Sequence, residues 1–284
     1  MTTLLHLQTA ADKGRARPDS VSTGSAADFL PPERTLPELR KAAASCRGCR
    51  LWTIGTQTVF GEGPPTARVL VVGEQPGDSE DRAGRPFVGP AGRLLDAALD
   101  AARIDRREVY VTNAVKHFNW EKREGTKRRI HKKPGDREIR ACFPWLDQEV
   151  ALLQPDVIVC LGATAAQALL GKDFRVTQQR GRPIQTDRGA TAFATVHPSA
   201  VLRAPPEARD ASEQEFFADL RKVGQYLARV GSRASEEVTA ERSARDREIP
   251  RAVTPAADRA PTPRRPSAGG RARTRAERRP RGDA

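Results

Sequence analysis

The chain has 284 residues, of which 49 are lysine or arginine and 36 are aspartate or glutamate, so its formal net charge at pH 7 is +13. No stretch reaches the roughly 18 uninterrupted apolar residues of a membrane-spanning helix, and four cysteines are too few for a disulfide scaffold of this length. The composition predicts a cytoplasmic protein with reduced thiols, no membrane association and an acidic partner, with nucleic acid as the first candidate.

The composition also divides the chain into three parts. Residues 1–33 are poor in apolar side chains and predict a disordered leader. Residues 231–284 are rich in arginine and proline, contain no aromatic residue, and predict a disordered basic tail. Residues 34–230 remain as one folded domain, which itself carries a net positive charge. The basic character is therefore not confined to the tail.

Short apolar runs alternate with helical patterns across the folded part. Strands are predicted at 67–72, 108–115, 156–161 and 191–196, and helices at 91–103, 136–153, 163–170 and 212–230. Strands that alternate with helices of this length imply crossover connections and parallel pairing. We therefore expect an α/β fold with a central, mainly parallel sheet, helices on both faces, and ligands at the carboxyl ends of the strands.

Polar motifs follow several of these strands, and the first is GEQPGD after the strand at 67–72. It sets Glu74 at the carboxyl end of a strand, in a turn bounded by Gly73 and Gly77. A solvated acid in a glycine turn is the commoner use of this pattern. Downstream, GRPFVGPAG places Phe87 in a loop just before a helix, where backbone amides can face an anion and the ring can stack on a base.

Two further strand ends carry a polar residue. Asn113 stands in the strand pattern at 108–115, and its amide can read the edge of a pyrimidine, although an Asx turn is its commoner use. His197 follows the strand at 191–196 in VHPSAVLR, where Pro198 fixes the turn. A histidine that bonds only its own loop is about as frequent as a functional one.

The segment at residues 116–140 is strongly basic, with ten basic and four acidic side chains. It contains KRRIHKK, in which His131 stands among cations that include Arg129. Such a run is usually a solvated surface or a phosphate-binding arm. Neighbouring cations also favour the neutral form of the imidazole. The alternative to a phosphate-binding surface is therefore a nucleophilic histidine near phosphates.

The four cysteines form a separate set. Cys46 and Cys49 make a C-x-x-C pair, which is typical of metal or redox sites, whereas Cys142 and Cys160 taken singly are more often buried core residues. Four thiols can hold one tetrahedral site, and the spacing does not separate zinc from an iron–sulfur cluster. All four lie inside the expected domain, which favours a shared site.

In this order, C-x-x-C, GEQPG, GRPFVGPAG, TNAVKHF, two further cysteines and HPSAVLR resemble the bacterial family 4 uracil-DNA glycosylases over residues 36–230. Gln75, where that family usually has alanine, and the inserted basic loop ending in KRRIH resemble the uracil-trapping UdgX branch. The resemblance implies a three-layer α/β/α sandwich. It also implies a structural [4Fe-4S] cluster held by Cys46, Cys49, Cys142 and Cys160.

The same resemblance implies a DNA-repair enzyme that acts on uracil-containing DNA, single- or double-stranded, and we expect a monomer. Phe87 would stack on uracil, Asn113 would read its edge, and His197 would donate to a uracil oxygen. His131 would attack the anomeric carbon of the deoxyribose, with Glu74 orienting it, and keep the sugar in a single-turnover covalent adduct. The residues expected to line or support the pocket are Gly73, Gln75, Gly77, Asp78 and Arg129.

Two alternatives remain open at the level of the sequence. A multiple-turnover family 4 glycosylase would hydrolyse the N-glycosidic bond with water and use the basic loop only to grip phosphate. A non-enzymatic nucleic-acid binding module with a metal or cluster would use GEQPG and HPS as turns. Its binding would be independent of uracil and steeply dependent on salt.

Overall fold

The computed structural model describes residues 24–125 and 128–248. The chain divides into two units, residues 1–236 and residues 237–284. Every strand of the described residues lies in the first unit, and the described part of the second, residues 237–248, is helical. Among the described helices, none is both long and apolar enough to cross a bilayer.

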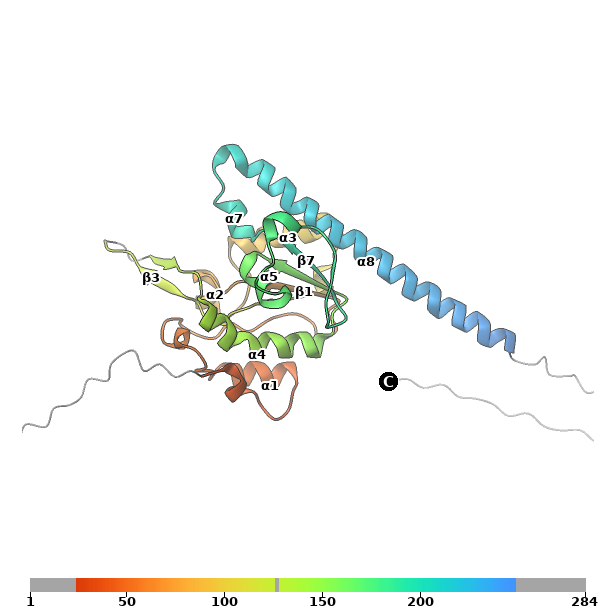
Figure 1. Cartoon of the computed structure of the whole chain (residues 1–284), viewed down its shortest axis with the longest axis horizontal. Helices are drawn as coiled ribbons and strands as arrows, with labels where there is room; N and C mark the ends of the chain where they lie inside the picture. Colours follow the sequence, from red (N-terminus) through yellow and green to blue (C-terminus); the bar gives the residue numbers. More distant parts are fainter. Residues whose placement is uncertain (1–23, 126–127, 249–284) are drawn as a thin grey trace, which may run out of the picture. The chain divides into compact units, whose positions relative to one another are not determined.

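A five-stranded sheet forms the centre of the first unit (Figure 1). Four strands are parallel, and only the short edge strand β6 runs antiparallel to its neighbour. The expected α/β fold with a mainly parallel sheet is therefore confirmed. The parallel strands appear as apolar runs in the sequence because both of their faces are buried. In sheet order the strands are β2 (Val109–Asn113), β1 (Val69–Gly73), β5 (Val157–Leu161), β7 (Thr191–Thr195) and β6 (Ile184–Gln185).

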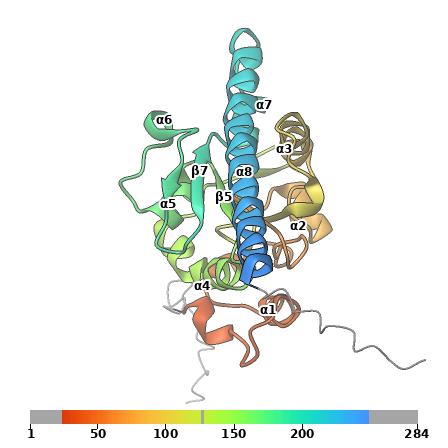
Figure 2. The same ribbon diagram turned by 90° about the vertical axis from the view of Figure 1, so that its right-hand side faces the viewer.

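Helices cover both faces of the sheet and complete three layers (Figure 1 and Figure 2). Because successive side chains of a strand point to opposite faces, Val69 of β1 packs with Leu95 and its neighbours on one face, and Leu70 packs with Leu146 on the other. The first face is covered by α3 (Pro90–Ala101), α7 (Pro198–Leu202) and the start of α8 (Pro206–Glu248), and the second by α4 (Asp136–Leu153) and α5 (Ala163–Leu170).

A further layer packs on α4, around Trp145. It consists of η1 (Ala26–Phe29), α1 (Leu36–Ala43) and η2 (Arg50–Thr53). The leader expected at 1–33 lies outside the described residues up to position 23, whereas Ala26 is fully buried against this layer. The expected tail begins inside α8, which continues to Glu248, and residues 249–284 lie outside the described residues.

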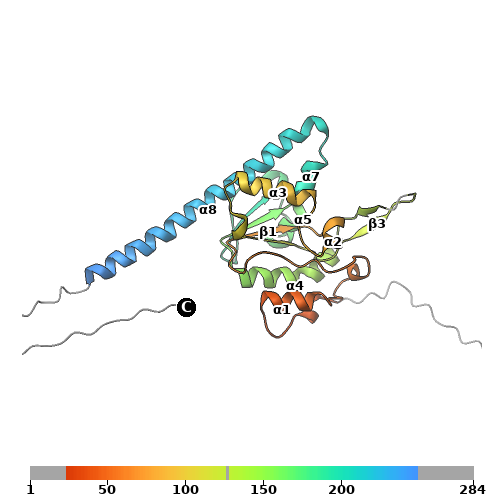
Figure 3. The same cartoon turned by 180° about the vertical axis from the view of Figure 1, so that it is seen from behind.

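Beside the main sheet, β3 (Trp120–Lys122) and β4 (Arg129–His131) form an antiparallel hairpin. Trp120 pairs with His131 in its register. Figure 3 shows the hairpin projecting at the end of the molecule where α2 (Asp78–Ala83) lies. The basic segment, expected as a loop, is therefore in part a β-hairpin. The remaining short elements are η3 (Arg106–Glu108) and α6 (Val176–Gln179).

The strand order has a reversal between β1 and β5. From β1 the chain moves to β2 on one side, and then to β5 and β7 on the other, so that β1 and β5 are direct neighbours. In open parallel sheets a crevice forms outside the carboxyl ends of the strands at such a point. The segments GEQPG, GAT and HPS leave the sheet at this edge, at or within one residue of the ends of β1, β5 and β7.

Candidate active site

A cavity of about 690 Å³ opens at the carboxyl ends of the strands. Its walls come from the segments after β1, β5 and β7, from the last residue of β2, from the loop before α3, and from β4 of the hairpin. Gly73, the last residue of β1, and Arg129, the first residue of β4, are not among the residues that line it. The other residues expected at the pocket all line it, and they are Glu74, Gln75, Gly77, Asp78, Phe87, Asn113, His131 and His197.

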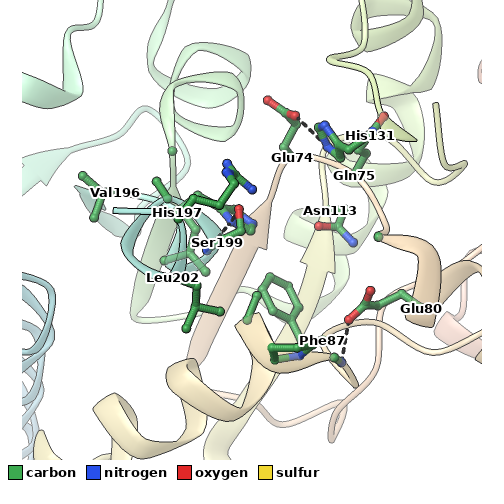
Figure 4. A pocket seen from close by; sticks show the side chains of 18 of the residues that line it. Glu74, Gln75, Glu80, Phe87, Asn113, His131, Val196, His197, Ser199 and Leu202 are labelled. Carbon is green, nitrogen blue, oxygen red and sulfur yellow. Dashed lines mark hydrogen bonds and ion pairs between the residues drawn. The ribbon is translucent and has the colours of Figure 1, made fainter. Parts of the chain in front are cut away.

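The carboxylate of Glu74 is held between His131 and Thr164. Nε2 of His131 is 3.3 Å from Oε1 of Glu74 (Figure 4), and the hydroxyl of Thr164 donates a hydrogen bond to Oε2. Burial pushes the pKa of Glu74 up, but the hydrogen bonds from His131 and Thr164 outweigh it and hold the pKa below its ordinary value. Glu74 is therefore ionised at neutral pH, with both oxygens engaged.

His197 faces the same cavity from the N-cap position of α7 (Figure 4). Its Nδ1 is 3.2 Å from the backbone nitrogen of Ser199 and 2.8 Å from the hydroxyl of that residue. Because a backbone N–H can only donate, Nδ1 accepts, and the proton of the neutral ring stands on Nε2. Burial lowers the pKa of His197 to about 4. The ring is therefore neutral at pH 7 and offers an Nε2–H donor.

Phe87 and Asn113 converge at one end of the cavity. A side-chain carbon at Gly73 would lie 2.3 Å from Oδ1 of Asn113 and 2.8 Å from Cζ of Phe87, so only glycine fits beneath them. Phe87 has a left-handed backbone, with φ of 56°, and the loop after it is held by the N–H of Gly89, which donates to buried Glu80 at 2.7 Å. An aromatic face and an amide are thus presented side by side.

A buried ion pair fixes Asn113 from within the core. Lys116 and Glu149 are both 0% exposed, and Nζ lies 2.6 Å from Oε2. Lys116 also donates to the backbone carbonyl of Asn113 at 2.8 Å, and Glu149 accepts from the hydroxyls of Tyr110 and Thr112. A buried pair is tolerated only when its donors and acceptors are satisfied in one geometry. The end of β2 is therefore rigidly placed.

Arg129 attaches the hairpin to α2. Its guanidinium pairs with Asp78 and, at 2.5 Å, with Oδ2 of Asp81, and it lies 5.3 Å from the ring centroid of Phe118. Asp81 is fully buried and the side chain of Arg129 is 10% exposed, so this contact is shielded from solvent. Arg129 therefore fixes β4, and with it His131, at the rim of the cavity.

Gln75 closes the base of the same hairpin. Its Nε2 donates to the carbonyls of Asn119 and Lys132, both at 3.1 Å, and its Oε1 accepts from the backbone N–H of Asn119 at 3.2 Å. Asn119 precedes β3 and Lys132 follows β4. Gln75 therefore joins the GEQPG turn to the strand that carries His131.

Three of the four cysteines lie in one core cluster. Cys46 and Cys142 are buried there, and Cys49 packs against them half-buried. Burial raises the pKa of Cys142 to about 12, and the thiols of Cys49 and Cys46 act in the same direction. Cys160 belongs to β5, pairs with Val72 and lies in a different core cluster. The structure thus brings three of the expected ligands together and places Cys160 elsewhere.

His117 is a buried histidine close to Cys142. It follows Lys116, whose backbone N–H donates to Sγ of Cys142 at 3.2 Å. Nε2 of His117 is 3.0 Å from the hydroxyl oxygen of Thr58, and that hydroxyl donates its hydrogen to the carbonyl of Ala43 at 2.8 Å. Thr58 can therefore only accept from Nε2–H, which leaves the lone pair on Nδ1. Metal-binding histidines commonly have their second N–H held in this way.

The donors gathered around Cys142 are three thiols and a buried imidazole. Within residues 24–125 and 128–230, no three His, Cys, Asp or Glu side chains stand around one point as ligands of a single metal. A four-iron cluster is larger than one ion, so its ligands stand farther apart. Three thiols and the neutral imidazole of His117, whose pKa burial lowers to about 4, are suitable donors for such a group.

Three features of the site were not anticipated from the sequence. Thr164 stands in GAT, directly after a strand, and the strand-end rule that selects Glu74 also applies to it. His117 lies inside TNAVKHF, but the residues around it in the sequence do not indicate a function for it. Lys116 and Glu149 carry no recognisable signal, because charged residues in a basic segment and in an amphipathic helix are typical of a surface.

Comparison with known proteins identifies the family. Residues 60–221 match the uracil DNA glycosylase superfamily, and the chain belongs to this superfamily. The chain is similar to several type-4 uracil-DNA glycosylases, whereas its membership of the uracil-trapping branch stays a prediction. The protein of Thermotoga maritima is 37% identical over 200 residues, which are 70% of this chain and 98% of the relative. The protein of Sulfurisphaera tokodaii is 34% identical over 190 residues, 64% of this chain and 82% of the relative.

Proposed function

We propose that this protein excises uracil from DNA and captures the exposed sugar as a covalent adduct with His131. The observation that carries the proposal is the contact inside the cavity between Nε2 of His131 and Oε1 of Glu74, at 3.3 Å. A carboxylate that touches an imidazole orients the ring and can accept its proton, as in other nucleophilic sites. Membership of the superfamily supports excision, and this pair supports capture.

The sheet side of the cavity suits recognition of the base. Phe87 would stack on the pyrimidine, the amide of Asn113 would pair with its carbonyl and N–H edge, and Nε2–H of His197 would donate to a carbonyl oxygen. When the N-glycosidic bond breaks, its electron pair passes to uracil. A neutral donor held at a uracil oxygen stabilises this developing charge. Uracil leaves as an anion and is then protonated.

The opposite side of the cavity suits the sugar, which becomes an oxocarbenium-like cation as the bond breaks. Ionised Glu74 stabilises the positive charge. A ring nitrogen of His131 then donates its lone pair to the anomeric carbon and forms a new N–C bond. The imidazolium so formed loses its remaining ring proton to Glu74 or to water. The neutral, alkylated histidine stays bonded to the DNA and ends the reaction after one turnover.

The nucleic acid itself would be held by the basic surface around the hairpin. Arg128, Lys132 and Lys133 are exposed next to His131, where they can meet phosphates. A target base in duplex DNA must leave the stack to reach the cavity, at a cost of about a few kcal/mol, whereas a single strand needs no unpairing. We therefore choose a single-stranded oligonucleotide for the first experiment.

A denaturing gel tests the proposal. With a uracil-containing oligonucleotide, the protein is expected to give a slowly migrating band that resists heat and detergent and is absent with a thymine oligonucleotide. His131→Ser should remove the band, because no ring nitrogen remains. Arg107→Ser, which removes an exposed cation just before the amino end of β2 and leaves the hairpin unchanged, should retain it.

Two other outcomes would replace this proposal. Free abasic product in molar excess over the protein, with no band, would indicate multiple-turnover hydrolysis by water. DNA binding that does not depend on uracil, with no base released, would indicate a non-enzymatic nucleic-acid binding module. Binding at two salt concentrations then measures the phosphate contribution.

We further propose that Cys46, Cys49, Cys142 and His117 hold a [4Fe-4S] cluster. The gathered thiols and the Nδ1 lone pair of His117 support this set, and the location of Cys160 in β5 speaks against the four-cysteine set. When bound, the cluster would cross-link the layer of α1 to α4, a structural role.

Visible absorbance and iron content test the ligand set. His117→Ala and Cys142→Ser are expected to lose both signals, whereas Cys160→Ser should retain them. Loss of the signals in Cys160→Ser, together with their retention in His117→Ala, would restore the four-cysteine set.

A further inference from the structure

Thr164 is a buried polar residue at the reversal point of the sheet. It is the second residue of α5, which is separated from β5 only by Gly162, and it is 3% exposed. Because β5 pairs with β1, the segment that follows β5 meets the segment that follows β1, which starts with Glu74. The topology thus brings together two residues that are ninety positions apart in the chain.

The contact between them has a defined direction. A carboxylate has no hydrogen to give, so the hydroxyl of Thr164 donates and Oε2 of Glu74 accepts. The other oxygen, Oε1, is then the one that meets His131, at 3.3 Å. Rotation of a carboxylate about its last bond has a low barrier. A single anchored oxygen therefore decides where the second one is presented.

We propose that Thr164 is a positioning residue, which anchors Oε2 of Glu74 so that Oε1 is aimed at His131 and solvent is kept from the carboxylate. This inference rests on the proposed function and deepens it. With the hydroxyl present, both oxygens of Glu74 are occupied by protein donors, and a water molecule has less opportunity to be oriented toward the sugar. Without it, the carboxylate rotates and takes a water at Oε2. Capture by His131 then slows, and hydrolysis competes.

The electrostatics of the cavity supply a second signature. The hydrogen bond from Thr164 helps to keep the pKa of Glu74 low, together with His131 and the more distant His197. The other charged side chains that line the cavity are Asp78, Glu80 and Arg203, and α5 itself carries no ionisable side chain. Loss of the hydroxyl should therefore raise the pKa of Glu74. A reaction that needs the ionised carboxylate would then begin to fail at a higher pH as the solution is acidified.

The experiment compares Thr164→Val with Thr164→Ser. Valine preserves the shape and removes the hydroxyl, whereas serine preserves the hydroxyl. Loss of a hydrogen bond to a charged group typically changes an equilibrium or rate constant by about 10- to 100-fold. Thr164→Val should therefore slow adduct formation by at least about tenfold. It should also raise the share of free abasic product and shift the acid limb of the rate profile to higher pH. Thr164→Ser should remain close to the wild type in all three measurements.

A matched control is available in the same sheet. Thr191 is equally buried, and its hydroxyl bonds to that of Tyr226 at 2.7 Å, at the amino end of β7 and away from the cavity. Thr191→Val should cost stability without moving the pH profile or the product ratio. Melting temperatures of all variants establish that they fold, and Thr164→Ala serves as a second hydroxyl deletion.

The outcomes separate this inference from the proposed function. Wild-type rate, product ratio and pH profile in both Thr164→Val and Thr164→Ala would overturn the positioning role, as would a serine variant as impaired as the valine variant. If the wild type itself forms no adduct, the capture proposal fails. The role of Thr164 is then decided by the pH profile of uracil release, where a shift supports it and an unchanged profile overturns it.

Discussion

The two walls of the cavity are built in different ways. The sheet wall presents Glu74, Asn113 and His197 at the ends of buried parallel strands, and the ion pair of Lys116 and Glu149 fixes it from behind. The hairpin wall consists of two three-residue strands that are exposed or half-exposed along their length. The side chain of His131 on that wall is 47% exposed, and that of Glu74 is 22% exposed.

This difference separates two tasks. Groups that read a base must be rigid, and a sheet edge backed by a packed core provides rigidity. A hairpin with few apolar contacts belongs to the part of a protein that opens most easily, so its position depends on a small number of polar attachments. Changes to the groups that read the base on the sheet wall should therefore slow base release and capture together, whereas changes to the hairpin should slow capture and leave base release.

The largest expected effect comes from the sheet wall. Asn113→Ala removes about two hydrogen bonds to the base, each contributing about 1–1.5 kcal/mol, so base release and adduct formation should both fall by about 100-fold. Single-turnover assays that quantify free uracil and adduct in the same samples would measure this. A variant that loses adduct while releasing uracil at the normal rate would contradict the assignment of Asn113 to the base.

A smaller and more selective effect is expected when the hairpin is detached from α2. Removing only one partner would leave a buried charge without compensation, so the suitable change is the double variant Arg129→Met with Asp81→Asn. We expect adduct formation to slow by about tenfold, the equivalent of about 1.4 kcal/mol of lost positioning, while uracil release stays within about twofold. Equal losses of both activities would show that the hairpin also serves base recognition.

The sheet wall was largely predictable from the sequence, whereas the hairpin was not. Buried parallel strands are apolar runs, so their ends could be located, and Glu74, Asn113 and His197 followed from that rule. The helices at Asp136–Leu153 and Ala163–Leu170 have the bounds that their periodicity predicts. The hairpin has no apolar face to give a period of two, and its pairing depends on the distant side chains that attach it.

The cysteine residues are a second case in which the sequence alone could not predict which side chains meet. The family resemblance implied four cysteine ligands, but only the fold reveals that Cys160 packs in the sheet core and that His117 stands near Cys142. A strand residue and a loop residue of equal polarity look alike in a sequence. Their neighbours differ because the register of β5 with β1 and β7 decides which side chains meet.

The smallest expected effect concerns Gln75, the second attachment of the hairpin. Its side chain makes three hydrogen bonds to backbone atoms of Asn119 and Lys132, but these are neutral bonds, which contribute about 0.5–1.5 kcal/mol each, and water can replace part of them. With Arg129 still in place, Gln75→Ala should slow adduct formation by about three- to fivefold and leave uracil release unchanged. Amide hydrogen exchange that is faster than in the wild type at residues 119–122 and 129–132, but unchanged in β1 and β2, would show that the hairpin, and not the sheet, has loosened. An unchanged exchange pattern together with a slowed capture would mean that Gln75 contacts the substrate itself, and the two walls would then share the recognition of the base.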